Sequence, residues 1–140
     1  AVLGLGATIH TNKREISADD FFTGLFETAL EEGEIVTKVV FLAPDAACYI
    51  KFPNPASRFA IVGSFVSKKG DDVRVAITGA GPGVFRVAEM EAALKANFSA
   101  DVVADIKVSP DGLNSDIHGS AEYRAHLVTV LSKRAVAGCG

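Results

Sequence analysis

The chain has 140 residues, of which 49% are hydrophobic and 22% charged, and its formal net charge is -3. This composition predicts one soluble domain with a sizeable core, and the acidic balance argues against nucleic-acid binding, which needs clustered basic residues. No apolar run approaches the roughly 20 residues of a membrane-spanning helix. Cys48 and Cys139 are too few and too distant in sequence to indicate a disulfide framework or a metal site, so a reducing cytosol is expected.

Apolar residues recur at every second position from Leu3 to Ile9, which predicts that residues 1–17 form a β-hairpin with its turn at residues 11–14. The chain begins with an apolar segment and lacks an initiator Met, which indicates a piece of a larger protein whose remaining part lies upstream. Ser17 or Asp19 can cap a short turn that follows the hairpin. The turn carries an apolar group that we expect to fill the space between layers: Phe21, Phe22, Leu25 and Phe26.

From Glu34 the pattern changes to β-strands rich in Val, Ile and Phe, with Lys69-Gly70-Asp71 as a hairpin turn. These strands are expected to form one antiparallel sheet, and they cover residues 35–42, 48–52, 59–67 and 72–78. An acidic run precedes them and is interpreted as a solvated turn: Glu27, Glu31, Glu32 and Glu34.

The second half has helical spacing, with one apolar stripe at Val87, Met90, Leu94 and Phe98 and a shorter one at Val102, Val103 and Ile106 after a Ser99 cap. Ser120 is expected to cap a third helix. Its buried face is predicted to hold Tyr123, Leu127, Val130 and Leu131. Arg124, Lys133 and Arg134 are expected to stay in solvent or to complement the C-terminal end of the helix dipole. The fold class is therefore α+β: an antiparallel sheet of three to four strands with about three helices on one face, preceded by a β-hairpin remnant of an upstream domain.

Two glycine-containing segments resemble parts of a dinucleotide fingerprint but do not complete it. After Gly4 and Gly6, the third glycine of the fingerprint is replaced by Ile9, and no helical pattern follows. After Gly79 and Gly81, in the loop at residues 79–83, the third glycine is replaced by Val84. That loop runs from a strand toward a helix, where amide groups could meet an anion. A structural turn is the favoured interpretation, with Pro82 beginning the next helix.

Asp116, His118 and Ser120 do not predict a catalytic triad, because alternating positions on one short loop cannot bring base and nucleophile together with an orienting carboxylate. The three histidines are too scattered to predict a zinc site. No catalytic or metal-binding residue is therefore predicted. Arg124 is expected to pair with a carboxylate inside the domain or to contact another subunit.

Six segments in this order resemble the C-terminal part of the FAD-binding medium subunit of molybdenum hydroxylases, a family that includes aerobic carbon monoxide dehydrogenase. They are residues 20–24, 33–36 with Leu30, 49–52, 57–63, 78–81 and 116–127. The resemblance implies that residues 1–24 end an FAD-binding second subdomain and that residues 25–138 form the C-terminal subdomain. It also implies three flavin contacts: Tyr49 as an aromatic covering the ring, Lys51 as a cation near it, and Val36 where the family usually has a leucine at the flavin edge.

The same resemblance implies an electron-transfer role in a cytoplasmic oxidoreductase. Its partners would be a large molybdopterin subunit and a small iron-sulfur subunit with [2Fe-2S] clusters, in a dimer of heterotrimers. The family's pyrophosphate-binding glycine loops lie upstream, so the fragment is expected to fold without stoichiometric FAD and to be inactive alone. The residues do not indicate a substrate.

Other interpretations stay open beside this one. Tyr49 and Lys51 alternate on a strand, and any exposed strand could present such a pair to water. A second hypothesis is an assembly module that docks the molybdenum and iron-sulfur subunits without a direct flavin role. An independent small enzyme is the least favoured, because no nucleophile, base and orienting group converge.

Overall fold

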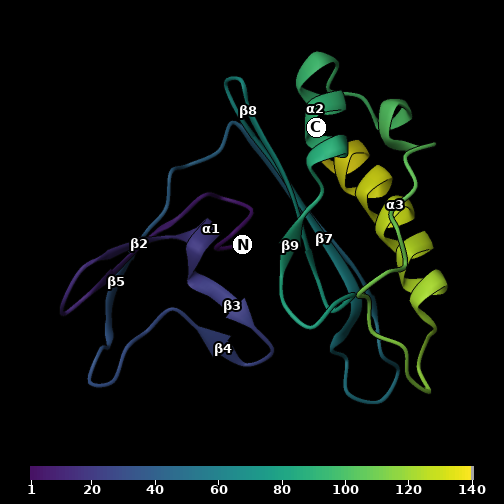
Figure 1. Ribbon diagram of the computed structural model, residues 1–140. Helices are drawn as coiled ribbons and strands as arrows, with labels where there is room; N and C mark the ends of the chain where they lie inside the picture. Colours follow the sequence, from purple (N-terminus) through teal and green to yellow (C-terminus); the bar gives the residue numbers. More distant parts are fainter. Residues whose placement is uncertain (140) are drawn as a thin grey trace.

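The computed structural model describes residues 1–139 and contains two parts that pack side by side (Figure 1). The N-terminal part has a three-stranded antiparallel sheet in the order β2-β1-β5. Its elements are β1 (Thr8–Thr11), β2 (Glu15–Ser17), α1 (Ala18–Phe21), β3 (Phe22–Gly24), β4 (Glu27–Thr28) and β5 (Val36–Val40). The predicted hairpin is present, with Ile9 opposite Ile16 and both side chains buried. Residues 1–6, expected as strand, instead form a turn in which the Leu5 amide donates to the Ala1 carbonyl at 2.8 Å.

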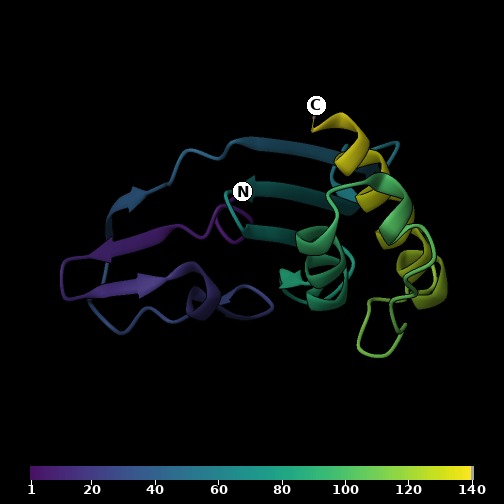
Figure 2. The same cartoon turned by 90° about the horizontal axis from the view of Figure 1, so that it is seen from above.

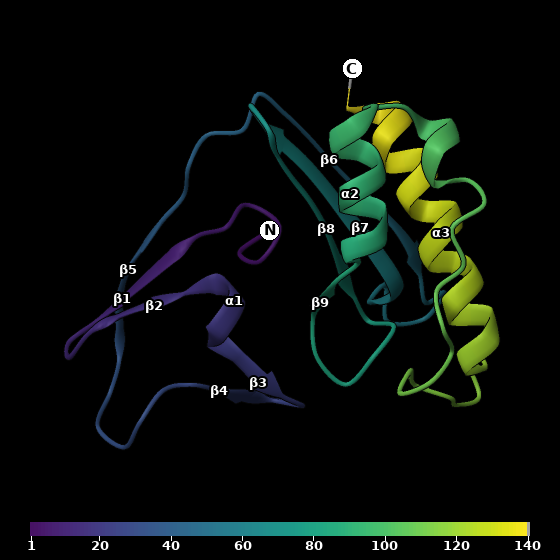
Figure 3. The same ribbon diagram turned by 45° about the horizontal axis from the view of Figure 1, so that its top comes forward.

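The larger part is a four-stranded antiparallel sheet in the order β6-β7-β8-β9, covered on one face by helices. Its strands are β6 (Ala46–Pro53), β7 (Ala60–Lys69), β8 (Asp72–Thr78) and β9 (Phe85–Arg86), and its helices are α2 (Ala88–Ala96), the 3-10 helix η1 (Ala100–Val103) and α3 (Ala121–Gly138). Figure 3 shows α2 and α3 on one side of this sheet and the N-terminal part on the other. The predicted α+β class, with three helical segments on one face, is confirmed.

One strand belongs to a different sheet than expected. Residues 36–40 form β5, which pairs with β1 through Ile9 opposite Val39, and they do not join β6. Val39 packs with Ile9 in the apolar cluster of the N-terminal part, which explains the pairing. The fourth strand of the larger sheet is β9, whose two residues pair with β8. The division of the chain after residue 24 stays a prediction, although the sheet of the N-terminal part also includes residues 36–40.

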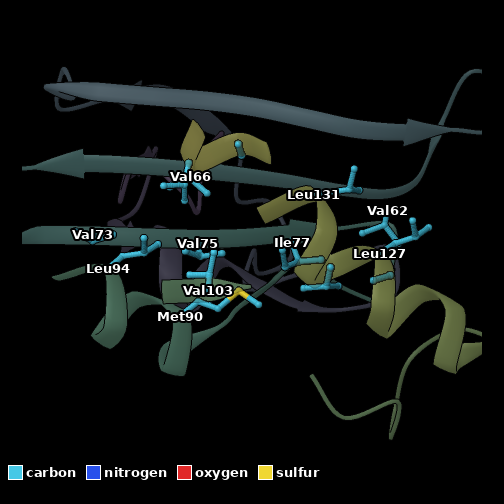
Figure 4. Packing of buried hydrophobic residues seen from close by; sticks show 14 of the residues in the cluster. Val62, Val66, Val73, Val75, Ile77, Met90, Leu94, Val103, Leu127 and Leu131 are labelled. Atoms are coloured by element: carbon cyan, nitrogen blue, oxygen red, sulfur yellow. The ribbon is translucent and has the colours of Figure 1, made fainter. Parts of the chain in front are cut away.

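Alternating residues of β7 and β8 supply the main core, which Figure 4 shows from close by. Val62, Val66 and Val75 are fully buried and face the helices. They pack against Met90 and Leu94 from α2, Val103 from η1, and Leu127 and Leu131 from α3. Buried Ser64 and Ser132 join their hydroxyls at 2.9 Å across this interface, so both buried hydroxyls have a hydrogen-bond partner. This burial fixes α3 against the centre of the sheet.

The opposite face of the same sheet receives the N-terminal part (Figure 2). Ala76 of β8 belongs to the apolar cluster of that part, together with Leu3 and Ala7. Asp19 of α1 accepts from Arg74 and Arg86, each at 3.0 Å. Although burial raises the Asp19 pKa, the hydrogen bonds from these two arginines lower it below its usual value. Apolar packing and ion pairs therefore hold the two parts together.

The 3-10 helix η1 and α3 begin at their predicted caps. Ser120 and Ser99 accept from the amides of Tyr123 and Asp101, as their cap positions predicted. Two predictions for α3 are wrong, since Tyr123 is 41% exposed and Arg124 only 4%. Pro82 does not begin a helix, because β9 intervenes and α2 starts at Ala88. Within residues 1–139, the apolar stretches of the helices are too short to cross a membrane.

Most of the apolar group at residues 21–26 does not fill the space between layers. Phe21 packs against the N-terminal cluster, but Phe22, Leu25 and Phe26 are 36%, 59% and 100% exposed. The backbone explains the difference, because the chain leaves α1 directly into the short β3–β4 ribbon and Phe26 turns outward with a φ of 57°.

The acidic run is not entirely solvated, because the Glu34 side chain is buried. Its carboxylate accepts from the Arg14 guanidinium at 3.0 Å, from the Glu31 amide at 2.8 Å and from the Thr11 hydroxyl at 2.7 Å. These hydrogen bonds, with that from Arg14 the strongest, lower the pKa of Glu34 to about 2. Glu34 thereby joins the β1–β2 turn to the segment that enters β5.

The low pKa of Glu34 predicts that its contacts with Arg14, Glu31 and Thr11 weaken in acid. Because the folded-state pKa of about 2 lies below the unfolded value near 4.5, the stabilisation is complete above pH 4.5 and is lost as the pH falls toward 2. Urea unfolding as a function of pH is expected to show this decline, and Glu34→Gln should flatten it. Glu27→Gln, in the exposed β4, is the control and should leave the pH profile unchanged. An equally steep profile for Glu34→Gln would contradict the assignment.

Candidate functional site

The face of β6 away from the helices carries two of the three residues that the sequence singled out. Cys48 and Ile50 pack on the helix side of the sheet, so the alternating Tyr49 and Lys51 point to the opposite side. The strand register places Tyr49 opposite Phe65 and Lys51 opposite Gly63. Cross-strand partners lie on the same face, so these residues form one surface that faces the N-terminal part.

The Tyr49 side chain lies over the backbone of Gly63, where a larger residue would contact it. A Cβ atom at residue 63 would lie 2.5 Å from the Tyr49 hydroxyl oxygen and 3.0 Å from Thr78 Cγ2. The first approach is shorter than any real Cβ contact, so a side chain at residue 63 would displace the Tyr49 ring from its position over β7. The Tyr49 residue remains 45% exposed in this position.

A cavity of about 210 Å³ lies beside Tyr49, between the sheet and the N-terminal turn. Its lining is largely apolar and includes Leu3, Phe22, Phe65, Thr78 and Val84. Burial raises the pKa of the Tyr49 phenol above its ordinary value of 10, so the hydroxyl is neutral at physiological pH. The sheet face that carries Tyr49 can therefore present an uncharged aromatic ring to a planar ligand.

Lys51 lies at the open end of the same face, where a turn holds it. Its ammonium donates to the Arg58 carbonyl at 3.0 Å. The turn is shaped by buried Asn54, whose side-chain oxygen accepts from the Ala56 and Ser57 amides at 2.9 and 3.2 Å. Only one donor of the Lys51 ammonium is used by this contact, and the residue is exposed. The remaining donors can meet an acceptor from outside.

Val36 lies apart from this pair. It is the first residue of β5, in the sheet of the N-terminal part, and is 41% exposed. It is absent from the lining of the Tyr49 cavity. The structure thus brings Tyr49 and Lys51 onto one surface and leaves Val36 on a separate sheet.

The glycine loop forms a turn between β8 and β9. Gly79 has a φ of 78°, and an added Cβ would collide with the Ala60 carbonyl oxygen. Residues 81–83 border an open cavity of about 610 Å³, which residues 22–24, 107–109 and 111–113 also line. The sequence indicated the turn but not this cavity, because residues 22–24 reach the loop only through the packing of the two parts.

The Asp116 segment has a structural role. Arg124 donates to both Asp116 carboxylate oxygens at 2.8 and 2.9 Å, and to the Ile61 and Gly79 carbonyls at 2.6 and 3.1 Å. The His118 amide and the Arg124 guanidinium lower the pKa of Asp116 below its usual value. The predicted pairing of Arg124 within the domain is confirmed. Among residues 1–139, the His, Cys, Asp and Glu side chains do not gather in threes around a possible metal position.

The family model of the CO dehydrogenase flavoprotein C-terminal domain matches residues 47–138, from β6 to the end of α3. The chain belongs to this family. The resemblance inferred from the six sequence segments is thereby confirmed. This flavoprotein domain contains Tyr49 and Lys51, whereas Val36 precedes the matched region.

Relatives of the flavoprotein domain extend the similarity upstream. The chain is 33% identical over 138 residues to the nicotine 6-hydroxylase medium subunit of Paenarthrobacter nicotinovorans, covering 91% of this chain and 49% of that protein. It is also 33% identical over 137 residues to the glyceraldehyde dehydrogenase medium chain of Sulfolobus acidocaldarius, with 89% and 48% covered. The chain therefore spans about half the length of these curated relatives.

Solved structures share the fold. Reconstituted CO dehydrogenase from Oligotropha carboxidovorans superposes with a TM-score of 0.76 at 22% identity, covering 99% of this chain and 54% of that chain. The match includes the N-terminal part as well as the flavoprotein domain, so the arrangement of both parts recurs in that structure.

Proposed function

We propose that this domain forms one wall of the isoalloxazine site in the FAD-binding medium subunit of a molybdenum hydroxylase. The observation that carries the proposal is the half-exposed Tyr49 ring, which extends over Gly63 beside a largely apolar cavity. FAD, when bound, supplies the electron transfer itself. The residues present fit a flavin, because an uncharged aromatic surface and a cation with free donors lie on one face.

Each residue has a distinct part in this proposal. Tyr49 stacks on the ring, which contributes about 1 kcal/mol beyond the area it buries. Lys51 stabilises negative charge on a bound ring through its remaining donors. Val36 is proposed to contact the flavin edge from its family position alone, since its strand belongs to the other sheet.

The whole protein is proposed to be a subunit of a cytoplasmic molybdenum-flavin-iron-sulfur oxidoreductase. Support comes from the names of the relatives, which are medium subunits of a nicotine hydroxylase and a glyceraldehyde dehydrogenase. A large molybdopterin subunit and a small [2Fe-2S] subunit would be its partners, in a dimer of heterotrimers. Residues 1–24 would end the upstream FAD-binding subdomain. The relatives act on different substrates, so this chain does not define one.

Substitution of Tyr49 and Lys51 in the full-length medium subunit tests whether these residues contact the flavin. Tyr49→Ala is expected to weaken flavin affinity at least about fivefold, the equivalent of the lost stacking. Lys51→Met is expected to make the flavin reduction potential more negative, because a cation near the ring favours the reduced state. Bound flavin is measured by its absorbance, and the potential by dye equilibration.

Two matched variants control for nonspecific damage. Tyr123→Ala removes a similarly exposed tyrosine from α3, and Lys133→Met removes an exposed cation from the same helix. Neither is expected to change flavin content or potential. If Tyr49→Ala and Lys51→Met abolish subunit assembly while flavin affinity and potential stay normal, the assembly module becomes the better interpretation.

A further inference from the structure

Two cysteines from opposite ends of the flavoprotein domain meet at one end of the main sheet. Cys48 lies near the start of β6, and Cys139 directly follows α3. A Cβ atom added to Gly138 would lie 2.9 Å from Cys48 Sγ, so this sulfur lies against the last turn of α3. The absence of a side chain at residue 138 is what leaves it room.

The Cys139 sulfur contacts the neighbouring strand, β7. It lies 3.7 Å from the carbonyl oxygen of Val66. Val66 is the residue directly opposite Cys48 in the β6–β7 ladder, and directly opposed residues have Cα atoms about 5 Å apart. Both sulfurs therefore lie beside the same cross-strand pair of β6 and β7, which brings the two cysteines close together at this end of the sheet.

The state of the two thiols is compatible with reaction. Both cysteines are free and partly exposed, and both pack against the edge of the main core. Burial raises the pKa of the Cys139 thiol to about 11, and the neighbouring Cys48 sulfur adds to this effect. The Cys139 thiol is thus protonated at neutral pH, so we assign it the second, resolving step of the reaction.

We propose that Cys48 and Cys139 form an intramolecular disulfide that fastens the C-terminal end of α3 to β6 when the protein meets an oxidising disulfide such as oxidised glutathione. The distance between these residues in the sequence argued against pairing, and the fold removes that objection. Neither residue belongs to the proposed flavin wall, because Cys48 points to the helix side of the strand that carries Tyr49.

The reaction is an exchange of thiol for disulfide. The Cys48 thiolate attacks one sulfur of oxidised glutathione, which forms a mixed disulfide and releases one glutathione thiolate. The Cys139 sulfur then attacks the Cys48 sulfur, forms the protein disulfide and releases the second glutathione. The two protein thiols lose two protons and two electrons in total, and the glutathione disulfide takes up both. A reducing thiol reverses each step.

Peptide mapping of the full-length protein tests the proposal. After incubation with oxidised glutathione, remaining thiols are alkylated, and the digest is analysed by mass spectrometry without reduction. The expected result is a cross-linked pair of peptides that contain Cys48 and Cys139, which dithiothreitol separates. Because the bond closes a long loop, the melting temperature of the oxidised protein is expected to rise by about 10 °C. In Cys139→Ser, glutathione should remain attached to Cys48.

A matched variant moves the thiol without removing it. In the double variant Ala47→Cys, Cys48→Ser, the thiol lies one residue earlier and on the opposite face of β6, so it should carry glutathione but no cross-link to Cys139. Thermal unfolding of this variant checks that it is folded. The proposal is overturned if oxidised wild-type protein keeps both thiols open to alkylation, carries only glutathione adducts, or cross-links only between molecules. It is equally overturned if the double variant cross-links as efficiently as wild type.

Discussion

Arg124→Met is expected to lower the free energy of unfolding by about 3 kcal/mol. The methionine can follow the path of the aliphatic stem, but it cannot donate to the Ile61 and Gly79 carbonyls or to Asp116. Buried carbonyls that lose their donor carry the full cost of desolvation. The loop at residues 116–120 also loses its attachment to α3. Urea denaturation followed by circular dichroism measures the change.

Arg134→Met is the control for this prediction. Arg134 lies on the same helix but is exposed, so its replacement should change stability by no more than about 0.5 kcal/mol. Equal stability of the two variants would show that the buried guanidinium is not needed to hold the strand ends and the loop together.

Gly79→Ala is expected to destabilise the protein by about 3 kcal/mol. Gly79 has a φ of 78°, where any side chain is strained by about 1 kcal/mol or more. The added Cβ would also collide with the Ala60 carbonyl oxygen and lie 3.0 Å from that of Ile61. These are backbone atoms at the start of β7, so the strand itself would have to move. The loss should appear as a lower urea midpoint with an unchanged m-value.

Gly112→Ala separates the two contributions. Gly112 has nearly the same φ, 76°, but a Cβ there would meet nothing within 4 Å. It should therefore show only the conformational cost of about 1 kcal/mol. If Gly79→Ala costs no more than Gly112→Ala, the close approach of the β8–β9 turn to β7 does not constrain residue 79.

The sequence predicted elements whose signals are local. Ser99 and Ser120 cap helical segments because a hydroxyl before a helix satisfies a free amide of its first turn, whatever the rest of the fold does. The alternation of apolar residues in β7 and β8 and the turn at Gly70 likewise required no distant partner. The order of six short motifs was sufficient to identify the family.

Errors arose where a distant contact outweighed the local pattern. One expectation placed Arg124 in solvent, but five acceptor atoms from three segments surround its guanidinium. Glu34 was placed in a solvated run, and Arg14 and Thr11 bury it. β5 has the composition of a core strand, yet it pairs with β1 because Val39 meets Ile9 there.

The sequence by itself determined the α+β class, the helix caps and the family, because alternation, capping and motif order are properties of neighbouring residues. The alternation of Tyr49 and Lys51 on one strand already placed both side chains on one face. Only the tertiary structure decided which strands share a sheet, and so that Val36 belongs to a different sheet from this pair. It also decided that Cys48 and Cys139 meet. The physical reason is that long-range pairing depends on which apolar surfaces bury one another, and a linear pattern does not specify the partner of each surface.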